Sequence, residues 1–130
     1  MKDAPGRASW LSLVLLIALV LGASKGWAWW QDRQIGTALR TLARPGDIRI
    51  FTTDTCFYCA QARAWLALQA VPWQECNVDR DSRCLQAFQA QGAPGVPLVQ
   101  ARGQWQLGFD KNWLLATLQS SPNRPSSPLP

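Results

Sequence analysis

The chain has 130 residues, which is enough for one compact domain and little more. Hydrophobic residues make up 48% of it and eight residues are Trp, so the composition excludes intrinsic disorder along the middle of the chain. The net charge of +5 is uneven, because residues 1–44 carry +4 whereas residues 45–120 carry six basic and six acidic side chains. The neutral part has no basic face with interleaved aromatic residues, and we therefore expect no binding to nucleic acid.

The first element in chain order is an apolar segment, WLSLVLLIALVLGA, at residues 10–23. Its length is that of the hydrophobic region of a signal peptide, and small residues suitable for cleavage follow it. Trp10 and the group Trp27, Trp29 and Trp30 are 17 to 20 residues apart, which is ~25–30 Å of helix and close to the thickness of a bilayer's hydrocarbon core. We expect residues 1–30 to be an uncleaved membrane anchor; a cleaved signal and a buried soluble helix are the alternatives.

The short N-terminal stretch before this apolar segment predicts how the segment is oriented in the membrane. Such a stretch usually stays in the cytoplasm, so the rest of the chain is expected on the far side of the membrane. In a bacterium, this makes the protein a single-pass inner-membrane protein with its folded domain in the periplasm. If the signal is cleaved, the domain is expected to be soluble in the periplasm.

Residues 31–44 are predicted to form a juxtamembrane helix or linker. Ile35, Leu39 and Leu42 fall on one helical stripe, and Pro45 with Gly46 breaks the helix. Residues 45–120 are expected to form the folded domain. Residues 121–130, SPNRPSSPLP, are rich in Pro and Ser and are expected to be a disordered tail.

The folded domain is predicted to begin with a strand, a helix and a second strand. A short β run starts at Ile48, and the helix that follows opens at Cys56 and ends at Val71 and Pro72. The second strand is WQECNV, residues 73–78.

Residues 79–82 are predicted to cap a second helix, which carries Cys84, Leu85 and Phe88 at core spacing. After the turn GAPGVP two strands form a hairpin, and a last helix begins at about Asp110. The order β-α-β-α-β-β-α predicts an α/β fold with a four-stranded mixed sheet, its first two strands parallel and helices on both faces.

Cys56 and Cys59 are the candidate redox pair. A cysteine attacks a disulfide as a thiolate, which requires a pKa below the usual value of about 8.5. The N-terminus of a helix favours negative charge, so Cys56 is the predicted attacking thiol. Cys59 lies one turn later on the same face and is the predicted resolving thiol.

The stretches IRIFTTDTCFYCAQARAWL, GAPGVP and QLGFD together resemble the glutaredoxin branch of the thioredoxin-like superfamily over residues 45–119. The resemblance implies a thioredoxin-like fold and a thiol–disulfide oxidoreductase without a tightly bound cofactor. It also implies a cis peptide bond at Val96–Pro97, which lets the backbone of Val96 pair with a substrate. The substrate-binding residues that it implies are Tyr58, Val96, Pro97, Gly108, Phe109 and Asp110.

Three positions depart from the family pattern. Thr53 stands where the family usually has Lys, Phe57 replaces the Pro between the cysteines, and Leu107 replaces the first Gly of the late motif. The missing Lys removes a cation for a glutathione carboxylate, so recognition of glutathione is expected to be weaker. Glutathione remains a candidate co-substrate, and protein or small-molecule thiols and disulfides are at least as good candidates.

Cys76 and Cys84 are a candidate structural disulfide between the second strand and the second helix. In an oxidising compartment they are expected to join, which would stabilise the fold by roughly 2.5 kcal/mol on the chain-entropy model. Two buried free thiols in a reducing compartment are the alternative.

Other functions are open at this point. One is a metal-binding module that uses Cys56, Cys59, Cys76 and Cys84, although the second pair is spaced widely for structural zinc and we expect no metal. An iron–sulfur cluster bridged by Cys56 and glutathione, known for some glutaredoxins, is disfavoured by Thr53. The third alternative is a thioredoxin-like binding module in which Cys56 and Cys59 form an inert disulfide.

Overall fold

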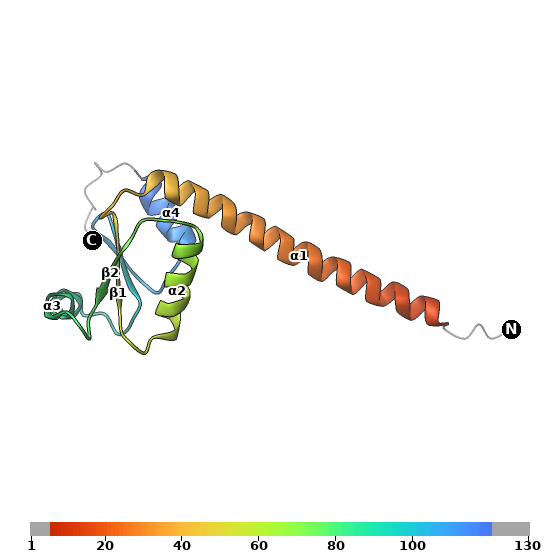
Figure 1. Ribbon diagram of the computed structural model, residues 1–130, viewed down its shortest axis with the longest axis horizontal. Coiled ribbons are helices and arrows are strands. Elements are labelled where there is room, and N and C mark those ends of the chain that lie inside the picture. The colour runs from red at the N-terminus through yellow and green to blue at the C-terminus, as the bar shows by residue number, and fades with distance from the viewer. Residues whose placement is uncertain (1–5, 121–130) are drawn as a thin grey trace, which may run out of the picture. The chain divides into compact units, whose positions relative to one another are not determined.

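A computed structural model gives the structure of the chain and describes residues 6–120. The chain divides into two compact units, Met1–Gln34 and Ile35–Pro130. The expected disordered tail, residues 121–130, lies outside the described residues. Helix α1, Arg7–Leu42, accounts for the described first unit except Gly6 and contributes its last turns to the second unit (Figure 1).

The first unit is an apolar helix whose large side chains are exposed. They include Trp10, Leu15 and Leu21, which are 60–67% exposed. The helix is long and apolar enough to cross a membrane, a property that it shares with signal sequences near an N-terminus. Near its polar end the rings of Trp27 and Trp30 lie 5.6 Å apart.

The second unit contains a four-stranded sheet with three further helices. Strands β1 and β2 are parallel, and β1–β3 and β3–β4 are antiparallel, in the order β2-β1-β3-β4. This arrangement confirms the predicted element order and the predicted four-stranded mixed sheet. The bounds are β1 Ile48–Thr52, α2 Phe57–Leu68, β2 Gln74–Asn77, α3 Ser82–Ala90, β3 Leu98–Ala101, β4 Gln104–Leu107 and α4 Lys111–Gln119.

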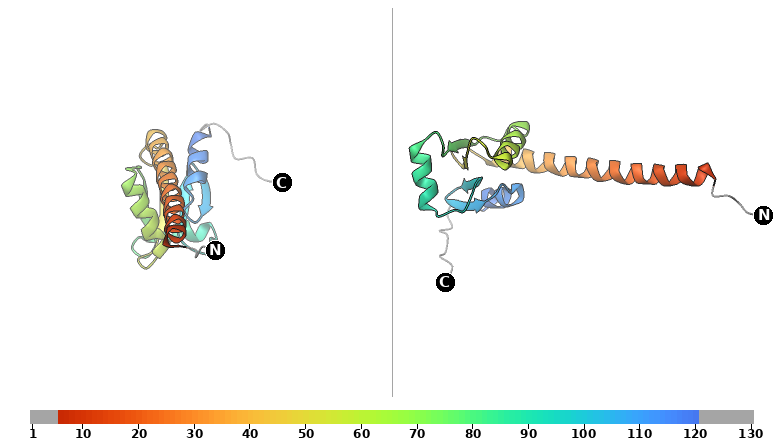
Figure 2. Two further views of the ribbon diagram at one scale, coloured as in Figure 1. Left: turned by 90° about the vertical axis from the view of Figure 1, so that its right-hand side faces the viewer. Right: turned by 90° about the horizontal axis from the view of Figure 1, so that it is seen from below.

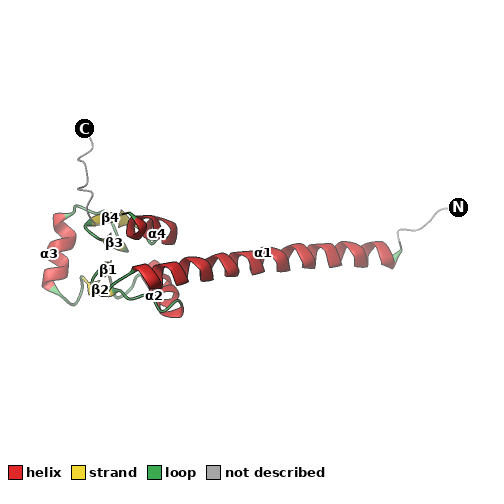
Figure 3. Cartoon of the chain, turned by 90° about the horizontal axis from the view of Figure 1, so that it is seen from above, coloured by secondary structure: helices red, strands yellow, loops and turns green. Residues whose placement is uncertain are grey.

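Helices cover both faces of the sheet, as the element order predicts. Alternation along β1 places Ile48 and Ile50 in one buried cluster and Phe51 in the other. The first cluster includes side chains of α2 and α4, and the second includes Cys84 of α3. Figures 2 and 3 show α3 on one side of the strands and α2 with α4 on the other. The sheet is therefore the middle of three layers.

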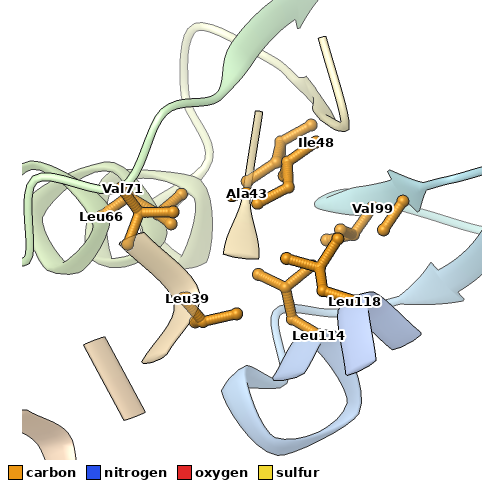
Figure 4. Close-up of a cluster of buried hydrophobic side chains, with 10 residues drawn as sticks. Leu39, Ala43, Ile48, Leu66, Val71, Val99, Leu114 and Leu118 are labelled. Atoms are coloured by element: carbon orange, nitrogen blue, oxygen red, sulfur yellow. The ribbon is translucent and has the colours of Figure 1, made fainter. Parts of the chain in front are cut away.

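The last turns of α1 belong to the core of the second unit. Leu39 is fully buried and Ala43 is 8% exposed. Figure 4 shows both with Leu66 of α2 and Leu114 of α4 in one cluster. The segment 31–44 therefore supplies core side chains to the compact unit, which begins at Ile35.

One predicted core residue lies outside the core. Leu85 is 38% exposed, whereas Cys84 is buried and Phe88 packs against the second cluster. Cys84 and Phe88 are four residues apart and share a helix face, but Leu85 is turned by about 100° from Cys84. The prediction for Leu85 is wrong because α3 presents only one narrow face to the sheet.

Arg102 connects three chain segments at the end of the sheet away from the cysteine pair. Its guanidinium donates to the carbonyl oxygens of Leu118 (2.6 Å) and Leu42 (3.3 Å), which lie at the ends of α4 and α1. It also lies 3.2 Å from the Asp47 carboxylate, just before β1. The positive charge is thus placed where two helix C-termini leave carbonyl groups unpaired.

Candidate active site

The loop after β1 places Cys56 at the start of α2. Cys56 is the N-cap of α2 with an extended backbone (φ −91°, ψ 110°), and its Sγ accepts a hydrogen bond from the N–H of Cys59 at 3.1 Å. The two residues are joined by a disulfide, with Cα atoms 5.2 Å apart. A sulfur at this position faces the unpaired N–H groups of the first turn, which favour a thiolate when the bond is reduced.

The two cysteines differ in exposure. Cys59 is fully buried, whereas Cys56 is half-buried. The residues between them, Phe57 and Tyr58, are 69% and 67% exposed, and their rings meet edge-on at 5.7 Å. An incoming disulfide therefore has access to Cys56 rather than to Cys59, and it meets two aromatic rings there.

A groove of about 780 Å³ lies along α2 between Tyr58 and Trp65. The Val96–Pro97 peptide bond beside it is cis, as the resemblance implies. Gly108, at φ +81°, donates its N–H to the carbonyl oxygen of Pro97 at 2.8 Å and so joins the two loops of the groove. The structure brings all of the substrate-binding residues predicted from the sequence to this groove: Tyr58, Val96, Pro97, Gly108, Phe109 and Asp110.

Asp110 performs a local structural role within the groove. Its Oδ1 accepts hydrogen bonds from the N–H groups of Asn112 (2.8 Å) and Trp113 (3.1 Å), so it is the N-cap of α4. The carboxylate is thus already engaged by the helix that it starts. Lys111, the next residue, supplies a positive charge to the groove wall.

Sequence reasoning missed Ala62 and Trp65, two groove residues that come from the body of α2. They line the groove at helical spacing from the predicted residue Tyr58, a signal that was readable from the sequence. The Trp65 ring lies 5.7 Å from Phe109, and the Lys111 ammonium lies 5.9 Å from the Trp65 ring. Leu107, one of the departures from the family pattern, also lines the groove and is 49% exposed.

Residues 48–105 match the family model described as glutaredoxin. The matched stretch runs from the start of β1 into β4 and contains both cysteine pairs. Among solved structures, the chain is similar to the thioredoxin-like protein BC3987 (TM-score 0.48, 21% identity, covering 54% of this chain and 97% of that one). It is similar to a glutaredoxin from Archaeoglobus fulgidus (0.47, 16%, 57% and 87%) and to a buckwheat glutaredoxin–glutathione complex (0.46, 19%, 72% and 87%). No curated protein matches the chain.

The position of the family's usual Lys is occupied by Thr53, which carries no charge. Arg63 of α2 is paired with Glu75 (2.7 Å from Nε to Oε1), and Arg80 is paired with Asp54, the residue after Thr53 (2.8 Å from Nε to Oδ1). The same Glu75 oxygen accepts from the buried Thr52 hydroxyl at 2.7 Å. Arg63 is therefore committed to holding β1, β2 and α2 together.

A second group that sequence reasoning missed holds the loop in front of Cys56. The N–H of Asp54 donates to Oδ2 of Asp79 at 2.8 Å, and Nδ2 of Asn77 donates to Oδ1 of Asp54 at 2.9 Å. Arg80 pairs with the same Asp54 oxygen at 2.8 Å. The sequence placed Asp79 only as a cap of α3, because nothing local to it indicates a bond to a residue 25 positions earlier.

Cys76 and Cys84 are joined by a disulfide between β2 and α3, with Cα atoms 5.4 Å apart. Each is 7% exposed, and both lie in the buried cluster around Phe51. Among residues 6–120, no three or more Cys, His, Asp or Glu side chains are arranged to share a metal ion. The four-cysteine metal site considered from the sequence is therefore not assembled in this part of the chain.

Proposed function

We propose that the protein is a membrane-tethered thiol–disulfide oxidoreductase that cycles Cys56 and Cys59 between dithiol and disulfide. The observation that carries the proposal is the Cys56–Cys59 disulfide at the first turn of α2 in a glutaredoxin-family domain. The difference in exposure supports Cys56 as the attacking thiol and Cys59 as the resolving thiol.

The reaction proceeds in two exchange steps. In the reducing direction, the Cys56 thiolate attacks one sulfur of the substrate disulfide, forms a mixed disulfide and releases the other substrate sulfur as a thiolate. The Cys59 thiolate then attacks Sγ of Cys56, forms the Cys56–Cys59 disulfide and releases the second substrate thiolate. Two electrons pass to the substrate, and oxidation of a substrate dithiol is the same sequence in reverse.

The preferred substrates are protein disulfides or other disulfides with apolar groups next to the sulfur. Support comes from the exposed rings of Phe57 and Tyr58, which offer apolar surface beside Cys56. Glutathione is a weaker co-substrate, because Thr53 offers no charge to its carboxylate and Arg63 is engaged by Glu75.

The domain is held at the periplasmic side of a bacterial inner membrane by α1. Support comes from the exposed apolar stretch of this helix and from the Trp residues at its two ends, which suit the two interfaces of a bilayer. A cleaved signal that leaves a soluble periplasmic domain is the alternative.

A single-turnover experiment tests the catalytic proposal. The full chain in detergent is reduced, freed of reductant and mixed with a disulfide-linked peptide that fluoresces when it is cleaved. We expect cleavage of about one peptide disulfide per chain. The Cys56→Ser variant is the matched control, since it retains Cys76 and Cys84 and so reports any cleavage by that pair. Cleavage by the wild type no faster than by Cys56→Ser would reject the proposed function.

A further inference from the structure

The loop that carries Cys56 is held from outside by the loop between β2 and α3. Residues 77–80, here called the latch, make three bonds to Asp54, two residues before Cys56. Oδ2 of Asp79 accepts a hydrogen bond from the backbone N–H of Asp54 at 2.8 Å. This bond fixes the main chain, whereas the bonds of Asn77 and Arg80 go to the Asp54 side chain.

The latch is itself fixed at both ends. The N–H of Val78 donates to the carbonyl oxygen of Thr52 at 2.9 Å, which ties the latch to the end of β1. The N–H of Asp79 donates to Oδ1 of Asn77 at 2.9 Å, which makes a tight turn inside the latch. The Cys76–Cys84 disulfide closes the segment, because Cys76 directly precedes the latch and Cys84 lies in the first turn of α3 after it.

We propose that Asp79 is a positioning residue for Cys56 and that the Cys76–Cys84 disulfide keeps Asp79 in place. The proposal rests on the proposed function, since it assigns a task within the same redox site. The first turn of α2 stabilises the Cys56 thiolate only when Sγ lies at the N-cap, and small displacements of a reacting group have large effects. A loosened latch therefore makes the reduced form less stable relative to the disulfide.

Two effects of Asp79 have opposite signs. Its carboxylate charge disfavours a nearby thiolate, so removing the charge alone would favour the dithiol. Removing the hydrogen bond that it accepts would favour the disulfide. Asp79→Ala removes both the charge and the acceptor, whereas Asp79→Asn removes the charge and keeps a carbonyl oxygen that can accept from Asp54.

The measurement is the equilibrium constant between the Cys56–Cys59 couple and glutathione in the full chain in detergent. Free thiols are alkylated after equilibration in buffers of set glutathione ratio, and peptides are quantified by mass spectrometry. Trypsin separates the two pairs, because Arg49 and Arg63 bracket Cys56 and Cys59. We expect Asp79→Ala to shift the equilibrium at least about fivefold toward the disulfide, whereas Asp79→Asn should stay within about twofold of the wild type or shift toward the dithiol.

Asp47→Ala is the matched control. Asp47 also accepts hydrogen bonds, from the N–H of Arg44 at 3.0 Å and from Arg102 at 3.2 Å, but it stands at the opposite end of β1 from Cys56. We expect this variant to lose stability and to keep the equilibrium constant within about twofold. An unchanged constant in Asp79→Ala, a shift toward the dithiol, or equal shifts in Asp79→Ala and Asp47→Ala would overturn the proposal.

The double variant Cys76→Ala/Cys84→Ala tests the second half of the proposal. We expect a shift toward the disulfide, and no more than about a twofold further shift when Asp79→Ala is added, because both changes release the same contact. No shift, or fully additive shifts, would reject the role of the second disulfide. The Asp79 variants decide the first half even when the double variant does not fold.

The readout separates this proposal from the proposed function. Alkylation reports the redox state of Cys56 and Cys59 whether or not the protein cleaves a substrate. If the protein does not cleave the peptide disulfide but Asp79→Ala shifts the equilibrium toward the disulfide, the positioning role of Asp79 stands and the proposed function is rejected. If the protein cleaves the peptide disulfide but Asp79→Ala causes no such shift, the protein is an oxidoreductase in which Asp79 does not position Cys56.

Discussion

Phe57 occupies the first helical position of α2, where the family pattern has Pro. Cys56 before it has an extended backbone, at φ −91° and ψ 110°, which is the conformation that a residue before Pro prefers. The first position of a helix needs no N–H donor, so Pro fits there without losing a helical bond. Pro would therefore fit this position of α2, but the chain has Phe57, whose aromatic ring is 69% exposed.

We predict that Phe57→Pro keeps the thermal midpoint of unfolding or raises it, but lowers cleavage of an apolar peptide disulfide about three- to tenfold relative to oxidised glutathione. The reason is the loss of up to about 2 kcal/mol of apolar contact that the ring can make with the substrate. Phe57→Ala is the control, because it also removes the ring and should show the same change in preference. Equal effects of Phe57→Pro on both substrates would contradict a role of the ring in selection.

At this scale the sequence predicts those site residues whose role depends on short spacing or on a family motif. Cys56, Cys59 and the groove residue Tyr58 lie within one turn of a helix that is recognisable from its composition. Asp79 was not predictable as a contact of Asp54, because the bond joins segments 25 residues apart and depends on the register of β1 and β2. Trp65 lies at helical spacing from Tyr58 and Ala62, but spacing alone does not show that this face of the helix lines a groove.

At the scale of elements, α1 ends inside the folded domain. The stripe of Ile35, Leu39 and Leu42 was visible in the sequence, but its partners in α2 and α4 lie far along the chain. Periodicity indicates that a helix has an apolar face and does not say what covers it. The burial of Leu39 against α2 and α4 therefore could not be predicted from the sequence and is known only from the structure.

Leu39→Ala is predicted to lower the free energy of unfolding of the domain by about 2–5 kcal/mol, because it leaves a cavity where a fully buried side chain stood. Leu21→Ala is the matched control on the same helix, since Leu21 is 60% exposed. Urea unfolding of the full chain in detergent, followed by Trp fluorescence, measures both variants. Similar midpoints for Leu39→Ala and Leu21→Ala would contradict the placement of Leu39 in the core.

Arg102 donates hydrogen bonds to the C-terminal ends of α1 and α4, so its substitution is expected to lower the stability of the domain. Arg102 stands at φ +46°, a conformation that Asn accepts more readily than most residues, so Arg102→Asn removes the guanidinium and keeps the turn. We expect the free energy of unfolding to fall by about 2 kcal/mol, because hydrogen bonds from a charged group to two helix C-termini are lost. Disulfide cleavage by the folded protein should be unchanged.

Arg83→Asn is the control for this variant, since the side chain of Arg83 is exposed. It should change stability by no more than about 0.5 kcal/mol. A loss in Arg102→Asn no larger than in Arg83→Asn, by the same urea unfolding, would show that Arg102 does not connect the helix ends in solution.

At the scale of the whole molecule, an apolar helix precedes a redox domain that contains two disulfides. The Cys76–Cys84 disulfide suits an oxidising compartment, because structural disulfides are rare in a reducing cytoplasm, whereas a catalytic pair such as Cys56 and Cys59 can occur in either compartment. Membrane attachment was predictable as a hypothesis from the apolar segment alone. The sequence does not distinguish a membrane anchor from a cleaved signal sequence, because the two kinds of segment have similar length and composition.

We predict that the protein remains in the membrane fraction after washing with alkaline carbonate, is released by detergent, and keeps its N-terminal residues by mass spectrometry. The reason is that an apolar helix of this length inserts strongly into a bilayer. A reporter fused after residue 120 should be active only in the periplasm. Release by carbonate with loss of residues 1–28 would replace the anchor by a cleaved signal, and a cytoplasmic reporter signal would reject the orientation.

The most direct test of the central claim is to trap the mixed disulfide. The Cys59→Ser variant of the full chain, with Cys56 reduced, is mixed with a disulfide-linked peptide and analysed by non-reducing mass spectrometry. We expect one peptide attached to each chain through Cys56, because no Cys59 thiolate is present to displace it. The double variant Cys56→Ser/Cys59→Ser should carry none. Absence of an adduct on Cys56, or attachment only through Cys76 or Cys84, would contradict the account.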